Sequence, residues 1–304
     1  MKHQNVELVT SHKAPLTIFV FGDLNAEEND PEFDDDVWQQ FVDDFKSTPN
    51  ARAVGLGDYG DWLRPTMRAK IQGALSGDSS ARHMVDDMVR AGQEKLLKRL
   101  QFMKGKLLGL HDGHHQWEFA DGTNSTQRLC AALKTPYLGW IASTRVSLDL
   151  YGSTNSCWTL VTTHGTGNSA TPTADAGGFE RTIVSSMVAD AYARGHGCKS
   201  VSWLPFERFV VRRRGPAGVE RQVPRAMIIG GFKKGYTNGW TTSYVEKAGM
   251  KSQARSYGKF VIKPNQRAGS AEEKGVEYGP RIGKHKRVFM EVTASIHGQQ
   301  SDVE

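Results

Sequence analysis

The stretch Leu16-Thr17-Ile18-Phe19-Val20-Phe21-Gly22-Asp23 sets the pattern on which this sequence is built. Its first six residues are mostly β-branched or aromatic, which predicts a short buried strand. The strand ends at a glycine and an aspartate, so a carboxylate is expected directly at a strand terminus. Residues 53–58 repeat the arrangement, because Ala-Val-Gly-Leu is followed there by Gly57 and Asp58. Buried strands in this chain therefore end at residues that can carry chemistry.

The elements after this opening alternate between strands and helices and then become mostly strands. Apolar, β-rich runs predict further strands at residues 107–110, 145–150, 158–162, 191–193, 259–262 and 288–292, and a hairpin that joins residues 206–213 to 219–229. Apolar spacing and acidic first turns predict helices from about residue 34 and at residues 65–75, 80–104, 126–133 and 183–189. This order favours an α/β architecture with a second sheet toward the C-terminal end.

The composition is that of a globular protein. The chain has 304 residues, of which 38% are hydrophobic and 24% charged, and this balance excludes a largely disordered chain. No stretch approaches the ~18 apolar residues of a membrane helix, and residues 1–15 lack the apolar core of a secretory signal. Three cysteines are too few and odd in number for a disulfide framework. We expect a cytoplasmic protein with no membrane partner.

The domain organisation is expected to be simple, because neither an internal repeat nor a low-complexity linker interrupts the sequence. We expect one domain over residues 1–297 and a flexible tail over residues 298–304. Within that domain, residues 16–200 would form the core that carries the site, and residues 201–297 would supply strands of the second sheet.

The charge is positive overall and unevenly distributed. The net charge is +6, and basic runs occur at Arg212-Arg213-Arg214 and at Lys233-Lys234. Each basic run taken alone is most simply explained as a solvent-exposed stretch of the surface. Together the runs are compatible with nucleic acid as a substrate or partner.

Five of the expected strands end at residues that can bind a metal ion: Asp23, Asp58, His114 with His115, His164, and His196. Ligands of layered α/β folds gather at the carboxyl ends of strands, so these side chains are expected to converge. Carboxylate and imidazole together suit divalent metals such as manganese, iron and zinc. A lone Gly-Asp is a common turn and a lone histidine is more often structural, but the consistent set indicates a metal centre.

The same residues resemble the five sequence blocks of the calcineurin-like metallophosphoesterases, which read Asp-x-His, Gly-Asp-x-x-Asp, Gly-Asn-His, a lone His, and Gly-His-x-His. The matching stretches occur in the same order: Gly22-Asp23-Leu24-Asn25, Gly57-Asp58-Tyr59-Gly60-Asp61, Gly113-His114-His115, His164-Gly165, and Gly195-His196-Gly197-Cys198. The second and fourth blocks match fully, and the first, third and fifth each depart at a single position. The match spans residues 16–199, and the strands expected after Gly230 look like the second sheet of phage and bacterial members.

The resemblance implies a four-layer α-β-β-α sandwich of two mixed sheets flanked by helices. It also implies hydrolysis of a phosphate ester by a metal-activated water. The metal cluster does not set the kind of ester, but the basic runs favour a phosphodiester such as a nucleic acid, or a nucleotide. Two divalent ions would be bound, manganese first, with zinc, iron or nickel as alternatives. By resemblance, Asp58 would bridge the two ions. The first ion would also be bound by Asp23, Asn25 and Cys198, and the second by His114, His164 and His196. His115 would lie beside the leaving group and would be oriented by Asp61.

Three positions depart from the family pattern. His114 replaces an asparagine, and imidazole is a capable ligand. Asn25 and Cys198 each replace a histidine, and by resemblance both serve the first ion. In one reading, Asn25 and Cys198 still bind the ion, and the soft thiolate ligand makes the site favour zinc or iron. In the other reading, the first site binds its ion more weakly. The second reading leaves a single-metal or non-catalytic protein of the same fold that binds phosphate or nucleic acid.

Two further alternatives stay open at the sequence level. A phosphomonoesterase acting on small molecules would use the same metal centre. The third block can also be aligned on Gly109-Leu110-His111-Asp112, but this alternative leaves Leu110, which cannot bind metal, at a ligand position.

Overall fold

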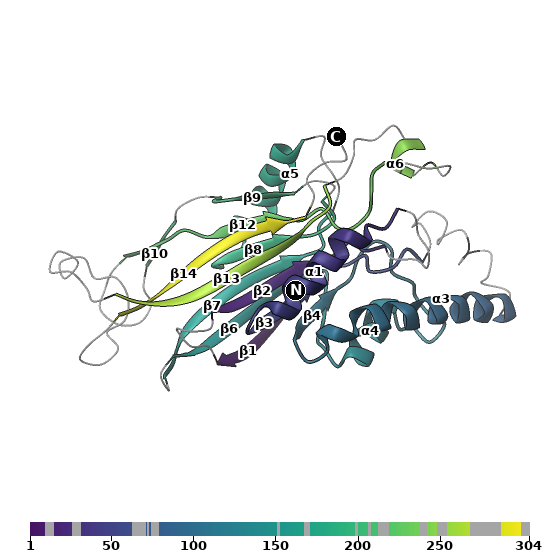
Figure 1. Ribbon diagram of the computed structural model, residues 1–304, viewed down its shortest axis with the longest axis horizontal. Helices are drawn as coiled ribbons and strands as arrows, with labels where there is room; N and C mark the ends of the chain where they lie inside the picture. The colour runs from purple at the N-terminus through teal and green to yellow at the C-terminus, as the bar shows by residue number, and fades with distance from the viewer. Residues whose placement is uncertain are drawn as a thin grey trace.

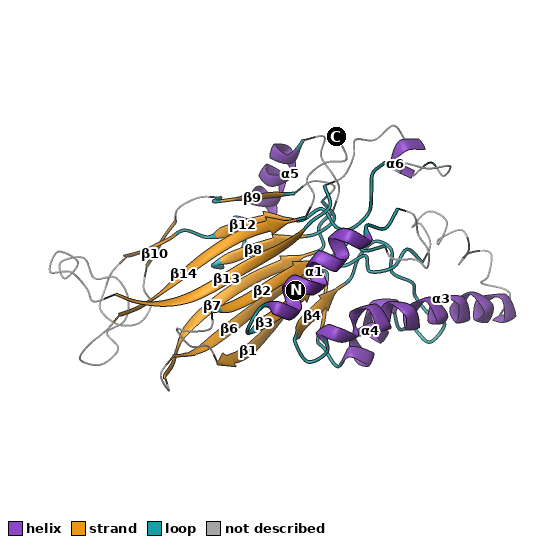
Figure 2. Cartoon of the chain, in the orientation of Figure 1, coloured by secondary structure: helices purple, strands orange, loops and turns teal. Residues whose placement is uncertain are grey.

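The computed structural model describes residues 1–9, 15–25, 32–62, 71, 73, 79–150, 153–166, 171–197, 200–205, 208–211, 219–236, 242, 244–247, 254–267 and 287–298. Two six-stranded sheets form the middle of the molecule (Figure 1). Helices α1 (Asp35–Ser47), α3 (Ser79–Leu100) and α4 (Ser125–Leu133) lie toward one side of the molecule, and α5 (Pro172–Phe179) lies apart from them, beside β9 (Val201–Trp203) (Figure 2). No helix in these ranges is long and apolar enough to cross a membrane.

The first sheet has the strand order β14-β13-β2-β3-β4-β5. Its strands are β2 (Leu16–Phe21), β3 (Ala51–Gly55), β4 (Leu107–His111), β5 (Tyr137–Gly139), β13 (Tyr257–Arg267) and β14 (Arg287–His297). The first four of these run parallel, while β13 is antiparallel to both β2 and β14. Strands β2, β3 and β4 therefore deliver their carboxyl ends to the same edge.

The second sheet has the order β1-β6-β7-β8-β12-β9. Its strands are β1 (Lys2–Val9), β6 (Ile141–Leu150), β7 (Ser153–Thr163), β8 (Ala191–Arg194), β12 (Arg225–Ile228) and β9 (Val201–Trp203). Strands β7 and β8 run parallel to each other. Strands β10 (Arg208–Val211) and β11 (Val219–Gln222) form an antiparallel hairpin. This confirms the first part of the expected hairpin, whereas residues 225–228, expected in its second arm, form β12 of the second sheet.

The helices are α1 (Asp35–Ser47), α3 (Ser79–Leu100), α4 (Ser125–Leu133), α5 (Pro172–Phe179) and the short α6 (Tyr244–Lys247). A 3₁₀ turn, Gln101–Met103, extends α3, and a π-helical turn, Glu180–Val184, extends α5. Asp34 caps α1, because its Oδ1 accepts a hydrogen bond from the Val37 backbone at 3.1 Å. Asn124 and Gln127 form a capping box at the start of α4.

The alternation of side chains along β2 explains how the layers stack. Leu16, Ile18 and Val20 are buried in the apolar layer between the two sheets, whereas Phe19 and Phe21 are buried against α1, α3 and α4. Successive residues of a strand point to opposite faces, so a strand that is buried on both faces must be apolar throughout. A third apolar layer lies between the second sheet and α5. These layers confirm the predicted α-β-β-α sandwich of two mixed sheets.

The distribution of strands between the sheets differs from the sequence expectation. Strands β13 and β14 extend the first sheet, because β13 pairs with β2. Strands β6, β7 and β8, expected in the core that carries the site, belong to the second sheet, where β9 and β12 join them. Pairing between distant strands depends on contacts that local patterns do not encode, so this part of the prediction is corrected.

One strand and two helices differ from the sequence prediction or cannot be compared with it. Strand β1 was not predicted, because residues 2–9 are largely polar and their edge strand needs only one apolar face. The helix expected at residues 183–189 begins earlier, at Pro172, and its π-helical turn ends at Val184. The helix expected at residues 65–75 lies almost wholly outside the described residues.

Asp44 connects helix α1 to strand β13. Its Oδ2 accepts hydrogen bonds from the Tyr257 hydroxyl at 2.8 Å and from Lys259 Nζ at 2.7 Å. Burial raises the pKa of the Asp44 carboxyl, but these two donors outweigh burial and the net pKa lies below the ordinary value. The ionised carboxylate is therefore favoured in the folded state.

We predict that Asp44→Asn lowers the free energy of unfolding at pH 7 by about 1 kcal/mol, because hydrogen bonds to a charged but partly exposed group are weakened. The pKa of Asp44 is lower in the folded state than in the unfolded state. The extra stability of the wild type over Asp44→Asn is therefore present above the unfolded-state pKa and is lost as the pH falls through the folded-state pKa. Urea unfolding of the wild type and of Asp44→Asn at pH 7 and pH 3 measures the two free energies of unfolding. Asp43→Asn, on the exposed face of α1, is the control, and equal losses in both variants at pH 7 would contradict the prediction.

Candidate metal centre

The predicted site residues follow strands whose carboxyl ends meet where the two sheets come together. Asp23 follows β2, Asp58 follows β3, His114 follows β4, His164 follows β7 and His196 follows β8. The first three strands belong to one sheet and the last two to the other. Residues far apart in the sequence are in direct contact there, since the His196 backbone N–H donates to Asp23 Oδ2 at 2.8 Å. The predicted convergence is confirmed for these five residues.

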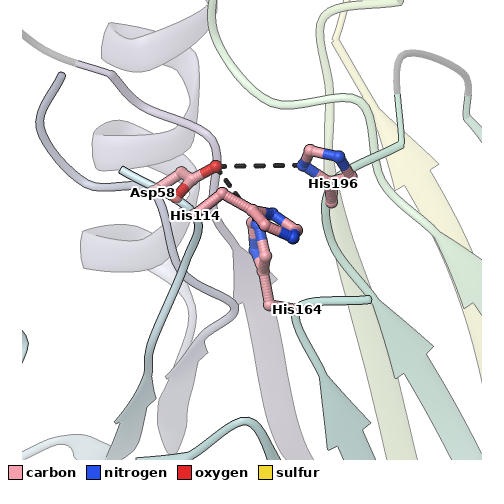
Figure 3. A group of neighbouring side chains, drawn as sticks. All are labelled: Asp58, His114, His164 and His196. Atoms are coloured by element: carbon pink, nitrogen blue, oxygen red, sulfur yellow. Dashed lines mark hydrogen bonds and ion pairs between the residues drawn. The ribbon is translucent and has the colours of Figure 1, made fainter. Parts of the chain in front are cut away.

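Four of these side chains form a compact group. Asp58, His114, His164 and His196 each present one ligand atom, and these atoms all lie within 4.8 Å of one another (Figure 3). Asp58 Oδ2 lies 3.2 Å from His164 Nε2 and 3.9 Å from His196 Nδ1. His114 Nδ1 lies 3.0 Å from His164 Nε2. One carboxylate and three imidazoles at these separations could hold a divalent metal ion.

The orientation of His164 is set by a backbone carbonyl. The His164 side chain is fully buried, and its Nδ1 lies 2.7 Å from the Leu56 carbonyl oxygen. A carbonyl can only accept, so Nδ1 carries the proton and donates. Nε2 is thereby directed at the group around Asp58. A carbonyl behind a histidine is the usual support for an imidazole that binds metal.

The electrostatics of the group favour a bound cation. Burial raises the pKa of Asp58, but His164, His196 and His115 outweigh burial and lower it well below the ordinary value. Burial, together with the neighbouring histidines, lowers the pKa of His114 to about 4. Metal ligands must be deprotonated before they bind. An ionised Asp58 and a neutral His114 meet that requirement near neutral pH. Burial lowers the pKa of His164, but Asp58 and Asp23 outweigh burial and raise it to about 9, so an ion bound there would displace a proton from this ring.

The side chain of Asn25 tests whether the residues present fit a metal ion. Its backbone N–H donates to the Asp58 carbonyl at 2.9 Å, which holds the residue beside the group of four. Its side-chain Oδ1 is buried and has no hydrogen-bond partner among the described residues. Leaving such an oxygen unsatisfied costs about 1–3 kcal/mol. A cation beside Asn25 would satisfy it, so the donors present fit the predicted metal centre.

Asp23 lies beside the four-residue group, where it accepts from the His196 backbone, but its carboxylate is not part of the group. Burial raises the pKa of Asp23, and the charge of Asp58 acts in the same direction against the opposing His164 and His196. Two carboxylates so close together are stabilised by a shared cation. Cys198, the third predicted ligand of the first ion, lies outside the described residues, so its role stays a prediction.

The backbone at the site is held in an uncommon conformation. Asp23, Asn25, Asp58 and His196 have φ values of 49°, 43°, 52° and 49°, in the left-handed region that non-glycine residues rarely adopt. Such residues cost about 1–3 kcal/mol each and persist where the surrounding structure enforces them, often at functional sites. The strain therefore coincides with the predicted ligands.

Gly113 is required by the closeness of Asp58. A Cβ atom at this position would lie 1.9 Å from Asp58 Oδ1. The same Oδ1 accepts a hydrogen bond from the His115 backbone N–H at 2.8 Å. The glycine of the third block thus lets the loop after β4 wrap around the carboxylate that the loop after β3 supplies.

His115 and Asp61 form the predicted pair. His115 Nδ1 lies 2.7 Å from Asp61 Oδ1, and His115 Nε2 lies 4.0 Å from Asp58 Oδ2. Burial raises the pKa of Asp61, but His115, together with the charge of Lys233, lowers it overall. An ionised Asp61 accepts from Nδ1–H and fixes the histidine tautomer, with Nε2 on the side of the metal centre.

The rival third block is not supported by the geometry. His111 is fully buried, with Nδ1 2.8 Å from the Gly139 carbonyl and Nε2 2.7 Å from Thr162 Oγ1. Burial lowers the pKa of His111 to about 3, so the ring is neutral. Both ring nitrogens serve these structural hydrogen bonds. Asp112 accepts hydrogen bonds from Asn124 and Tyr137, so this segment has a structural role next to the site.

Sequence reasoning missed Trp140. Its indole ring lies 5.1 Å from the His114 ring and 5.9 Å from the His164 ring, measured between centroids. The side chain is 40% exposed. Trp140 follows β5 as the predicted ligands follow their own strands, but a strand of three residues was too short to be predicted. An aromatic residue just after a Tyr-Leu-Gly run was the one available signal.

Of the basic residues proposed for an anionic partner, only Lys233 and Lys234 are described, since Arg212, Arg213 and Arg214 lie outside the described residues. Lys233 Nζ lies 3.9 Å from Glu32 Oε2 and acts electrostatically on Asp61. The Lys234 backbone N–H donates to the Glu32 carbonyl at 2.6 Å. Lys233 therefore places positive charge close to the His115–Asp61 pair.

Comparison with known proteins gives few matches. No protein-family model matches the sequence, and no curated protein matches it. Solved structures similar to this chain include vacuolar protein sorting 29 from Cryptosporidium parvum, with 10% identity over 93% of this chain and 100% of that chain and a TM-score of 0.34. A putative 5′-nucleotidase from Staphylococcus aureus matches with 10% identity over 96% of this chain and 56% of its own, at a TM-score of 0.35.

A third similar structure is the calcineurin-like phosphoesterase YfkN from Bacillus subtilis, with 13% identity over 93% of this chain and 90% of that chain and a TM-score of 0.36.

We predict that Gly113→Ala weakens Mn²⁺ binding at least tenfold, because the added Cβ would displace the Asp58 carboxylate. Calorimetric titration measures the affinity, and the Mn²⁺-dependent rise in melting temperature should shrink in parallel. Gly177→Ala in α5 is the control, since no atom lies within 4 Å of its added Cβ. Wild-type affinity in folded Gly113→Ala would show that Asp58 does not bind the ion.

Proposed function

We propose that this protein is a metal-dependent phosphoesterase that hydrolyses a phosphate ester, with a phosphodiester as its substrate. The observation that supports the proposal most is the group of Asp58, His114, His164 and His196, whose ligand atoms lie within 4.8 Å of one another. Asn25 adds a candidate ligand, because its backbone bonds to Asp58 and its buried Oδ1 has no hydrogen-bond partner among the described residues. The five sequence blocks occur in the order expected for calcineurin-like metallophosphoesterases.

Two divalent ions are proposed. Asp58 would be their shared ligand, with Asp23, Asn25 and Cys198 on the first ion and His114, His164 and His196 on the second. Manganese is the first choice, and zinc, iron and nickel are alternatives that accept the same donors. Ions held there would act as Lewis acids on phosphoryl oxygens and would activate a water for attack.

His115 is proposed as the group beside the leaving oxygen. Asp61 holds its Nδ1 at 2.7 Å, so Nε2 is available to donate a hydrogen bond or a proton as negative charge develops on that oxygen. The side chain is 22% exposed, so a substrate can reach it. Lys233 adds positive charge near this pair, which suits an anionic substrate such as a nucleotide or nucleic acid.

A second candidate is a single-metal or non-catalytic protein of the same fold that binds phosphate or nucleic acid. One observation favours it: Asp23 stands outside the four-atom group. The phosphoesterase is preferred because His115 and Asp61, which a binding protein would not need, keep their contact at the mouth of the site.

We predict that metal-stripped protein hydrolyses bis(p-nitrophenyl) phosphate only after Mn²⁺, Zn²⁺, Fe²⁺ or Ni²⁺ is added back. Asp58→Asn should lower the rate at least a thousandfold, because the shared carboxylate is lost. Asp87→Asn, an exposed aspartate on α3 paired with Arg90, should leave the rate unchanged. Release of p-nitrophenolate measures the rate, and p-nitrophenyl phosphate run alongside distinguishes diesterase from monoesterase activity. Folded wild-type protein that is inactive with every metal would favour the binding protein.

We predict that Asp61→Asn lowers kcat by about 10- to 100-fold while metal content stays the same, because the amide no longer fixes the His115 tautomer. Steady-state kinetics together with elemental analysis of the purified protein test this. Loss of metal in Asp61→Asn would instead place Asp61 among the ligands, and an unchanged kcat would remove His115 from its proposed role.

A further inference from the structure

A cleft of about 450 Å³ lies between the carboxyl ends of β7 and β8 and helix α5. Clefts that bind small molecules are commonly ~300–1,000 Å³ and are lined by apolar and aromatic side chains with a few polar groups. Here Trp140, Ile141, Phe179 and Ile183 supply the apolar and aromatic wall, and Arg194 with Asp175 supplies the charged groups. The cleft therefore has the size and the composition of a small-molecule site.

The cleft adjoins the metal centre. Trp140 lines it and also contacts the His114 ring, with centroids 5.1 Å apart. Gly165, the residue after His164, lies on its rim and packs so closely on Arg194 that a Cβ there would lie 2.4 Å from the guanidinium Nε. Arg194 ends β8, two residues before His196. A phosphate held by the metal centre would therefore have its ester group next to this cleft.

The chemistry of the walls selects the kind of group that fits. Trp140 is 40% exposed and offers an aromatic face, on which a base can stack. Arg194 and Asp175 are both buried, at 6% and 2% exposed, and their charges interact. An aliphatic group would lie against these charged groups without matching them. A planar ring with polar edges suits both the aromatic face and the charged pair.

We propose that this cleft receives the nucleoside part of the substrate, with the base stacked on Trp140. The proposal rests on the proposed function and deepens it, because it makes a nucleotide ester the substrate class. The base would be bound by this chain's own residues beside the metal centre, with the phosphate at Asp58 and the base under α5.

Helix α5 provides a matched pair of variants. Gly178 lines the cleft, whereas its neighbour Gly177 does not. An added Cβ meets no atom within 4 Å at either position. Leucine is also a better helix former than glycine. Gly178→Leu therefore fills the cleft with a side chain, and Gly177→Leu places the same side chain on α5 outside it.

The experiment compares two esters: thymidine 5′-(p-nitrophenyl phosphate) and methyl p-nitrophenyl phosphate. We expect the wild type to prefer the thymidine ester in kcat/KM, and Gly178→Leu to lower the ratio of the two values at least tenfold. Gly177→Leu should keep the wild-type ratio. Calorimetric binding of thymidine 5′-monophosphate should weaken at least tenfold in Gly178→Leu and stay unchanged in Gly177→Leu.

An unchanged ester ratio in Gly178→Leu, or the same change in both variants, would overturn the cleft proposal while hydrolysis of the methyl ester upheld the phosphoesterase. Inactivity toward both esters would count against the phosphoesterase, and the binding measurement would then decide the cleft on its own. In that case, weaker thymidine 5′-monophosphate binding in Gly178→Leu alone would uphold the cleft, and equal binding in both variants would overturn it.

Discussion

The arrangement of this protein depends on one buried carboxylate. Asp58 is 4% exposed at the end of β3, and a charge in that position is tolerated only when other groups surround it. Its carboxylate is surrounded by imidazoles from both sheets, of which His164 Nε2 is the nearest, and it accepts a hydrogen bond from the backbone N–H of His115. The sheets must therefore meet with their strand ends together, and the left-handed backbone of four predicted ligands is the local cost of bringing them there.

Much of this arrangement is legible in the sequence, because it depends on local patterns. Apolar runs such as residues 16–21 predict buried strands, and the glycine before Asp23, Asp58, His114 and His196 predicts a sharp turn at the strand end. The identity of the residue after that glycine, aspartate or histidine, then predicts the chemistry. The layered fold follows from the same alternation, since Ile18 and Phe19 are buried on opposite faces of one strand.

Other features could not be predicted, because they depend on contacts between distant residues. Pairing of β13 with β2 sends the last strands to the first sheet, and nothing near residue 257 indicates it. Trp140 reaches His114 only because β5 lies at the edge beside β4. The sequence left open whether Asn25 binds an ion or weakens the first site; the structure holds its backbone against Asp58 and buries its Oδ1 with no hydrogen-bond partner among the described residues.

The central claim is that Asp58 joins two metal ions at the meeting point of the sheets. The most direct measurement is anomalous diffraction from a crystal of the full chain grown with Mn²⁺. The account predicts two peaks about 3.5–4 Å apart, as in two-metal sites, with Asp58 between them, one beside Asn25 and the other beside His164. No peak at Asp58, or a single peak bound only by the histidines, would contradict the two-metal account.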